Sequence, residues 1–237
     1  MPQSSCCSRF RNFYFLINFA SMNVNVLISR FFSGTDPYIE VFDQENVYAV
    51  YLRLQEALRD MPDIELSILQ ALAYCFYEVM DNVLVHSGKP CGTVMMEYLP
   101  DKKRIKILVA DDGMGIRASL SQNPQFSDIS EETALLSCIE DKVTSGNGMG
   151  FGLYSTAKLV KDAGTMLLIH SGNHCLTYND GIAVVKSGGK WQGTIVFFEL
   201  FSDKEINPDA VVDNRTSIKE QYNETFLDNQ DIFDELW

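Results

Sequence analysis

The chain has 237 residues, of which 46% are hydrophobic and 22% are charged, and its formal net charge is −13 at pH 7. This length and composition indicate a globular protein with one domain and extensions, or with two small domains. The acidic balance and the lack of a basic stripe argue against a nucleic-acid partner. Six cysteines without a CxxC pair or a regular spacing indicate reduced, buried side chains, so we expect a cytoplasmic protein.

Residues 1–43 form an N-terminal extension in this interpretation. Residues 9–29 place two arginines before an apolar run, as a signal peptide does. Asn18, Asn23 and Asn25 interrupt the run, and it is too short to span a bilayer as a helix, so we expect neither secretion nor a membrane anchor. Its aromatic and β-branched content favours one or two strands, and we therefore expect a strand-rich extension.

Residues 44–201 carry the periodicity of a folded domain. Helical spacing of apolar residues predicts helices at about 44–61, 64–86, 131–141 and 153–163. Runs of β-branched and aromatic residues predict strands at 93–99, 104–110, 165–170, 176–178, 182–185 and 194–200. The segment 117–130 reads as loose, and residues 202–237 are acidic and without periodicity, so we expect a solvated tail there, with at most a short helix.

Three polar or Gly-rich clusters occur in order along this domain. The helix at 64–86 places Glu78, Asn82 and His86 four residues apart, hence on one face. Because each unpaired polar group buried in so apolar a helix costs a few kcal/mol, the register of the three indicates a function. The strand at 104–110 runs into Asp111-Asp112-Gly113-Met114-Gly115, which alone would be read as an Asp-Gly turn.

The third cluster is the stretch GNGMGFGL at residues 146–153. Glycine in a packed element costs stability, so four in alternation suggest a backbone that approaches a ligand closely. Phosphate is the usual ligand, held by main-chain N–H groups and the N-terminus of the following helix. The alternative is a flexible linker, but linkers pair glycine with polar residues, whereas Met149, Phe151 and Leu153 are interleaved here.

Together the ordered motifs ExxxN, DxGxG and GxGxG resemble the N, G1 and G2 boxes of the GHKL superfamily of ATPases, which holds DNA gyrase, MutL, the histidine kinases and the heat-shock chaperone ATPases. The resemblance covers about residues 65–200. The patterns ExxxNxxxH and Gly148-Met149-Gly150-Phe151 look most like the anti-sigma-factor serine kinases. The first histidine of the chain is His86, so no phosphoacceptor helix pair precedes the domain and autophosphorylation is not expected.

The resemblance implies a role for each residue of the first cluster. Asn82 would hold Mg²⁺ beside the ATP phosphates, because this hard ion is satisfied by oxygen ligands. Glu78, one turn away, would be the general base that polarises an attacking hydroxyl or water. For His86 two interpretations stay open, a contact with the phosphates or a cap on the helix.

The resemblance assigns nucleotide binding to the other two clusters and to one late strand. Asp111 would accept a hydrogen bond from the adenine amine above Gly113 and Gly115, and Thr194 would support the adenine side. The glycine-rich loop would act as the ATP lid and hold the phosphates through Gly146, Asn147, Gly148, Met149, Gly150 and Phe151.

Some features depart from the family pattern or suggest other sites. Gly152 is a fourth glycine where the family often has a small or polar residue, and Lys142 is the only basic residue just before the lid. Neither a Rossmann GxGxxG register nor a Walker lysine is present. We do not expect a structural zinc site at His170, His174 and Cys175, because these residues bracket a predicted turn between strands.

The resemblance therefore implies an α/β (α+β) two-layer sandwich of Bergerat type, with a mixed, mostly antiparallel sheet and helices on one face. It implies a Mg-ATP-binding regulatory protein, a serine-kinase-like switch acting on a protein partner. The alternative is a non-kinase ATPase module whose ATP-dependent lid closure controls what it binds. The identity of the partner and the formation of a homodimer stay open.

Overall fold

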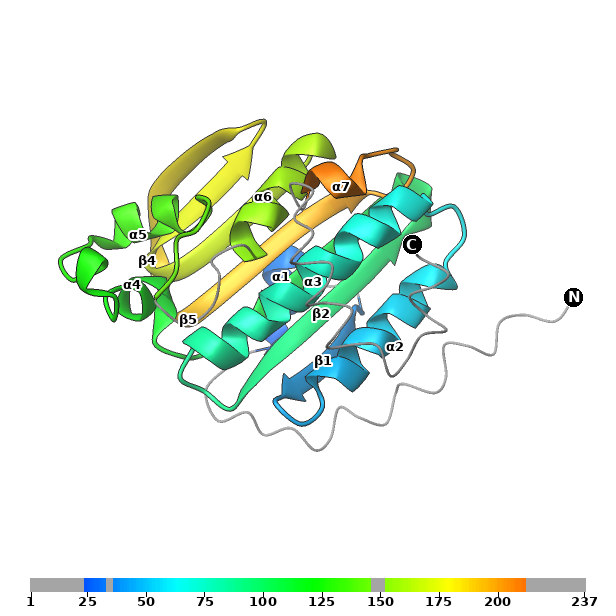
Figure 1. Ribbon diagram of the computed structural model, residues 1–237. Helices are drawn as coiled ribbons and strands as arrows, with labels where there is room; N and C mark the ends of the chain where they lie inside the picture. The colour runs from blue at the N-terminus through cyan, green and yellow to red at the C-terminus, as the bar shows by residue number, and fades with distance from the viewer. Residues whose placement is uncertain (1–23, 33–35, 146–151, 212–237) are drawn as a thin grey trace, which may run out of the picture.

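The computed structural model describes residues 24–32, 36–145 and 152–211 (Figure 1). Five strands form one sheet in the order β1-β2-β3-β5-β4, and every neighbouring pair is antiparallel. The strands are β1 (Tyr38–Asp43), β2 (Cys91–Leu99), β3 (Arg104–Ala110), β4 (Met166–Asn179) and β5 (Ile182–Phe201). A short 3-10 turn, Pro100–Lys102, links β2 to β3 at the place where the sequence predicts a turn.

Helices cover one face of this sheet and one end of it (Figure 1). Over the face lie α2 (Val47–Arg59), α3 (Leu66–His86), α6 (Gly152–Asp162) and the short α7 (Pro208–Val211). The shorter helices α4 (Gly115–Leu120) and α5 (Glu131–Ser137), with the 3-10 turn Pro124–Phe126 between them, lie at the end beside β4 and β5. The predicted two-layer arrangement is confirmed, and its sheet is antiparallel throughout the described residues.

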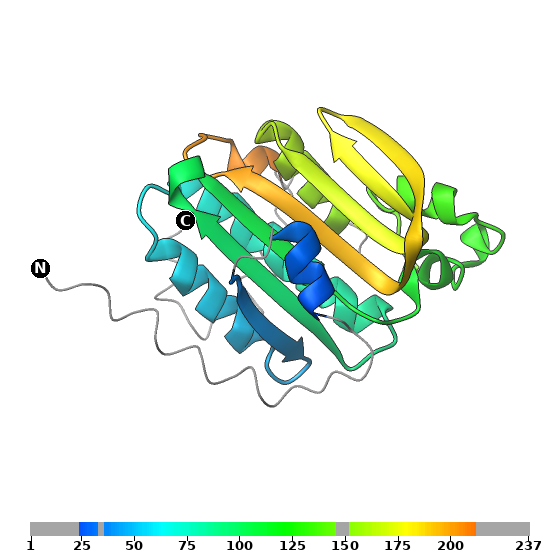
Figure 2. The same cartoon turned by 180° about the vertical axis from the view of Figure 1, so that it is seen from behind.

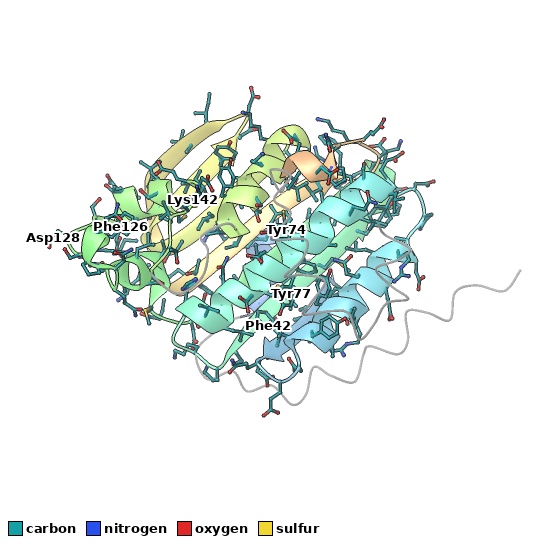
Figure 3. All side chains as sticks on the ribbon, in the orientation of Figure 1. Phe42, Tyr74, Tyr77, Phe126, Asp128 and Lys142 are labelled. Carbon is teal, nitrogen blue, oxygen red and sulfur yellow. The ribbon has the colours of Figure 1, made fainter. Side chains whose placement is uncertain are left out.

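The main core lies between the helices and the sheet, with α3 at its centre. Leu72, Phe76 and Met80 of this helix are fully buried, and Phe42 of β1 joins the same cluster (Figure 3). Burial of each such side chain contributes roughly 1.5–3 kcal/mol to stability. By length and composition α3 could also cross a membrane, but 61% of its most apolar window is buried inside this fold.

The opposite face of the sheet carries a single described helix, α1 (Val24–Phe31), as seen from behind in Figure 2. Leu27 and Phe31 pack there with Phe197 of β5, and the rings of Phe31 and Phe197 are 4.8 Å apart. The one or two strands expected within residues 9–29 therefore do not include residues 24–29, and residues 9–23 lie outside the described part of the chain. The aromatic and β-branched content favours strand, but the apolar side chains of 24, 27, 28 and 31 recur at helical spacing, and their burial decides the conformation.

Three further expectations are corrected. The last four predicted strands are two long ones, because the turn signals at 171–174 belong to an irregularity inside β4 and not to a chain reversal. Residues 202–211, which were expected to belong to a solvated tail, pack against the domain. Ser202 is buried, its N–H donates to Lys103 O at 2.9 Å, and α7 buries Val211 in the main core. The segment predicted as loose, 117–130, contains most of α4 and the second 3-10 turn.

Candidate functional site

A cleft opens where α3, α4 and α6 meet the end of β3 and the neighbouring part of β5. It has a cavity volume of about 100 Å³. Three of these elements are next to or contain the sequence motifs. The helix α3 contains the ExxxN motif, β3 ends at the DxGxG motif, and α6 begins within the Gly-rich stretch. Of the predicted site residues, the described lining includes Asn82, His86, Asp111, Gly115 and Thr194.

Asp111 follows the last residue of β3 and is buried, with 3% of its surface exposed. Its Oδ1 accepts a hydrogen bond from the N–H of Gly113 at 2.7 Å, and its own N–H donates to Thr194 O at 2.9 Å. Burial raises the pKa of the carboxyl to about 6, although the hydrogen bonds from Gly113 and Thr194 counteract this shift. The result is a fixed, buried acceptor beside Thr194 at one wall of the cleft.

The glycines of the DxGxG segment are required by close contacts. A Cβ on Gly113 would lie 2.2 Å from Ser87 O, so the loop after β3 passes directly beside the end of α3. Gly115 has φ +80°, which other residues rarely adopt, and it begins α4. Gly115 lines the cleft, whereas Gly113 is not part of its described lining.

Glu78 and Asn82 lie on the face of α3 that meets the start of α6. Glu78 does not line the described cleft, yet it lies next to it, because Gly152 lies against both side chains. Burial, and then the charge of Asp81, raise the pKa of the Glu78 carboxyl to about 7. Asn82 has no hydrogen-bond partner for its side chain within the described part of the chain, so its amide is free to meet a ligand in the cleft.

A model of the family described as "Histidine kinase-, DNA gyrase B-, and HSP90-like ATPase" matches residues 68–202. The chain belongs to this family. The match spans the three motifs and the helices and strands next to them. It supports ATP binding as a property of this domain. The finer likeness to anti-sigma-factor serine kinases is not part of what the match shows.

Two further comparisons complete this result. No curated protein matches the chain. Among solved structures, the 43K ATPase domain of Thermus thermophilus gyrase B, solved in complex with an aminocoumarin, is similar at 17% sequence identity and a TM-score of 0.31. That similarity covers 70% of this chain and 43% of the gyrase chain, so our chain spans less than half the length of that structure.

His86 closes α3 beside the cleft of this ATPase domain. Its Nδ1 lies 3.1 Å from Ser145 Oγ, the last described residue before the Gly-rich loop. Burial lowers the pKa of the imidazole, which favours the neutral form. This contact connects the end of α3 to the segment that leads into the Gly-rich loop. The predicted phosphate-binding residues Gly146, Asn147, Gly148, Met149, Gly150 and Phe151 lie outside the described residues.

The described lining of the cleft is mostly apolar and carries few charged side chains. No Lys or Arg is part of its described lining. Lys142, the basic residue nearest the loop in sequence, lies in the segment after α5 and does not belong to that lining (Figure 3). The described walls beyond the predicted residues are largely apolar, and they include Val109, Ile116, Leu120 and Cys138. Sequence reasoning did not find these wall residues, because apolar side chains on short elements carry no motif.

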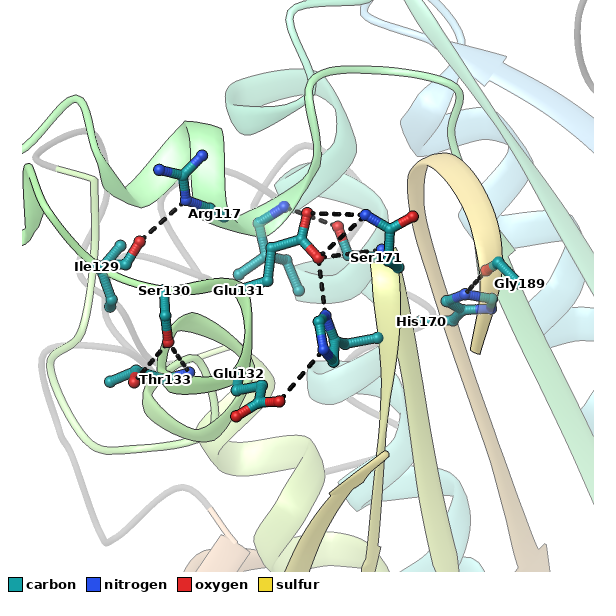
Figure 4. A network of polar contacts seen from close by, with 12 residues as sticks. Arg117, Ile129, Ser130, Glu131, Glu132, Thr133, His170, Ser171 and Gly189 are labelled. Atoms are coloured by element: carbon teal, nitrogen blue, oxygen red, sulfur yellow. Dashed lines mark hydrogen bonds and ion pairs between the residues drawn. The ribbon is translucent and has the colours of Figure 1, made fainter. Parts of the chain in front are cut away.

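The histidines near β4 are used within the protein. His170 contacts Arg30 at 3.2 Å and Gly189 O at 2.7 Å, whereas His174 pairs with Glu131 of α5 at 2.7 Å (Figure 4). The two imidazoles therefore have separate partners. Within the described residues no group of three or more His, Cys, Asp or Glu side chains could hold a metal ion. The turn expected between them is instead a register shift within β4.

Proposed function

We propose that this protein is a Mg-ATP-dependent regulatory switch of the serine-kinase type, which acts on a protein partner. One observation carries the proposal: a single cleft brings Asn82 and His86 of α3 together with Asp111 after β3 and Thr194 of β5. Four residues from two separated motifs and one late strand meet there, in a domain of an ATPase family. Motifs that converge on one cleft support a shared ligand better than any of them does alone.

Asp111 is proposed to recognise the adenine ring. A buried carboxylate accepts a hydrogen bond well and donates none when ionised, so it suits the exocyclic amine of adenine. Its Oδ1 is already held by Gly113, which fixes the direction in which the group points. Thr194 lies beside it through the backbone bond to Asp111 and lines the same cleft.

Asn82 is proposed to hold Mg²⁺ together with the nucleotide phosphates. The residues present fit this ion, because Mg²⁺ is usually bound through few protein oxygens and keeps water and phosphate oxygens as further ligands. The Asn82 side chain lines the cleft and lacks another partner within the described residues. When bound, the ion would neutralise part of the phosphate charge.

Glu78 is proposed to be the general base. In the kinase reaction its carboxylate would take the proton of a serine hydroxyl on the partner while the hydroxyl oxygen forms a bond to the γ-phosphorus and ADP leaves. A pKa near 7 leaves the carboxyl partly ionised at neutral pH and makes it a stronger base than an exposed glutamate. Its position one turn before Asn82 places it next to the proposed phosphate end of the cleft.

A second function is favoured by one specific observation. Phosphoryl transfer is commonly assisted by Lys or Arg at the transferring phosphate, and the described lining of this cleft has neither. A non-kinase module can regulate its partner through ATP binding itself, so its function does not depend on fast phosphoryl transfer. In that alternative ATP binding controls the association with a partner and water replaces the serine hydroxyl.

Labelled ATP distinguishes these functions. The protein is incubated with Mg²⁺ and γ-³²P-ATP, alone and with proteins encoded next to its gene, and with the Glu78→Ala variant as a control. Label on a serine of one partner, lost in the variant, supports the kinase. Release of free phosphate without labelled protein supports the ATPase alternative, and a lack of ATP binding contradicts both.

A further inference from the structure

The β4–β5 hairpin (Gly172–Trp191) leaves the sheet next to the loop that carries Asp111, and residues at its base hold that loop. The Oγ of Ser171 accepts a hydrogen bond from the N–H of Ile116 at 3.0 Å and donates one to Gly193 O at 2.9 Å. Trp191 donates its ring N–H to Asp111 O at 3.2 Å. The side-chain amide of Gln192 donates to Gly113 O at 2.6 Å. We call Ser171, Trp191 and Gln192 the hairpin clamp.

The clamp acts on the backbone and does not touch the cleft. None of its three residues belongs to the described lining, whereas Asp111, Gly115 and Ile116, which they hold or adjoin, all do. Ser171 is 95% buried and satisfies one N–H and one carbonyl at once, so removal of its hydroxyl would leave both without this partner. The clamp therefore bears on the cleft only through the loop.

The loop that carries Asp111 is packed closely against β5 and Ser171. Gly193 has φ +93°, and a Cβ on it would lie 2.2 Å from Asp111 O and 2.6 Å from Asp111 Oδ1. A Cβ on Gly115 would meet Ser171 Oγ at 2.6 Å. Gly193 of β5 and the loop are thus in close contact, and a small shift of either would move the Asp111 carboxyl relative to Thr194.

We propose that Ser171 and Trp191 are positioning residues that set the selectivity of this site for purine nucleotides with an exocyclic 6-amino group. Selectivity follows because a hydrogen bond to Asp111 depends on direction and distance, and the clamp fixes both. Binding of the phosphates does not depend on Asp111, so the clamp affects recognition of the base alone. This inference rests on the proposed function, in which Asp111 recognises the adenine amine.

Calorimetry with three ligands tests the proposal. ATP carries the 6-amino group, inosine triphosphate carries an oxygen in its place, and inorganic tripolyphosphate has no base. Ser171→Ala removes the hydroxyl, and Trp191→Phe removes the ring N–H but keeps an aromatic side chain. Ser187→Ala is the matched control, since it deletes the same atom from an exposed serine of the same hairpin.

Wild-type protein and Ser187→Ala are expected to bind ATP more tightly than inosine triphosphate. In Ser171→Ala and Trp191→Phe the ATP affinity should fall about 3- to 10-fold and its ratio to that of inosine triphosphate should fall with it. Tripolyphosphate affinity should change little. The melting temperature of Ser171→Ala is expected to fall, because two buried backbone groups lose their partner, but this loss of stability does not change the ratio between the two nucleotides. An unchanged ratio of ATP affinity to inosine triphosphate affinity in both variants would overturn the proposed role of the clamp. An equal loss of affinity for all three ligands would overturn it as well. Wild-type protein that binds none of them would overturn the proposed function, and the clamp with it.

Discussion

Gly152 lies directly against Asn82, and a Cβ at position 152 would come 2.8 Å from the Nδ2 of Asn82. The same atom would lie 3.2 Å from the Oε2 of Glu78. The first residue of α6 thus has no room for a side chain, because α3 places its two polar groups there. This contact accounts for the fourth glycine of the Gly-rich stretch, which the family pattern left unexplained.

Substitution of Gly152 by alanine should disturb ligand binding more than folding. The methyl group would displace the Asn82 amide or the start of α6 by a few tenths of an ångström, and we expect the affinity for Mg-ATP to fall about tenfold. Alanine also raises helix propensity, which offsets part of any loss of stability. Gly189→Ala is the control, since a Cβ there meets nothing within 4 Å. Equal ATP affinities in the two variants would contradict the proposed place of Asn82 in the site.

Alanine substitutions of Glu78 and Asn82 should affect different properties of the protein, the first turnover and the second Mg²⁺-dependent binding. Glu78→Ala should still bind Mg-ATP but turn it over roughly 10²–10⁴-fold more slowly, because only the base is lost. Asn82→Ala should weaken ATP binding when Mg²⁺ is present and much less when it is absent. Affinity with and without Mg²⁺, turnover and melting temperature are measured for both variants. If both only lose stability, with no separation of binding from turnover, the two residues are structural.

The raised pKa of Glu78 should make stability fall as pH rises. A glutamate has a pKa of 4.5 in the unfolded chain and about 7 here, so the folded state binds the proton more tightly between these values. Stability is therefore lost as the pH rises through this window, by on the order of 3 kcal/mol in total. Asp111, with a pKa of about 6, adds a decline of the same sign.

Glu78→Gln isolates the first contribution. The variant cannot ionise, so its free energy of unfolding should exceed that of wild type by more at pH 8 than at pH 5, by about 2–3 kcal/mol in difference. Urea unfolding at the two pH values measures this. A difference between variant and wild type that does not change with pH would show that Glu78 titrates normally. Turnover in the same range should rise with pH through about 7, as the base ionises.

The sequence predicts those parts of the fold whose periodicity is strong. The apolar face of α2, the apolar length of α3 and the β-branched run of β3 each produce one element within two or three residues of the expected bounds. The long strands β4 and β5 were split, because glycines and polar residues at 171–174 and 187–190 look like turns. In the structure they form a register shift and the exposed part of a hairpin.

Motifs in the sequence indicated several residues that lie together at the cleft, and they gave no signal for the residues that hold its loop. Asn82, His86 and Asp111 are far apart in sequence, but each belongs to a recognisable pattern, and all line one cleft. Ser171 and Trp191 have no such pattern. Their importance comes from hydrogen bonds to backbone atoms of residues 55 and 80 positions away, which no local signal encodes. The sequence marks Gly152 only as a departure from the family pattern, which often has a small or polar residue at this position.

The central claim is that the cleft binds ATP with Asp111 as the acceptor for the adenine amine. Calorimetric titration of wild type and Asp111→Asn with ATP tests it most directly. The amide of asparagine can present an N–H where the adenine amine needs an acceptor, a mismatch that costs on the order of 1–3 kcal/mol. We predict that wild type binds ATP and that the variant loses about tenfold or more in affinity with its melting temperature preserved. An unchanged affinity for ATP in Asp111→Asn would contradict this account.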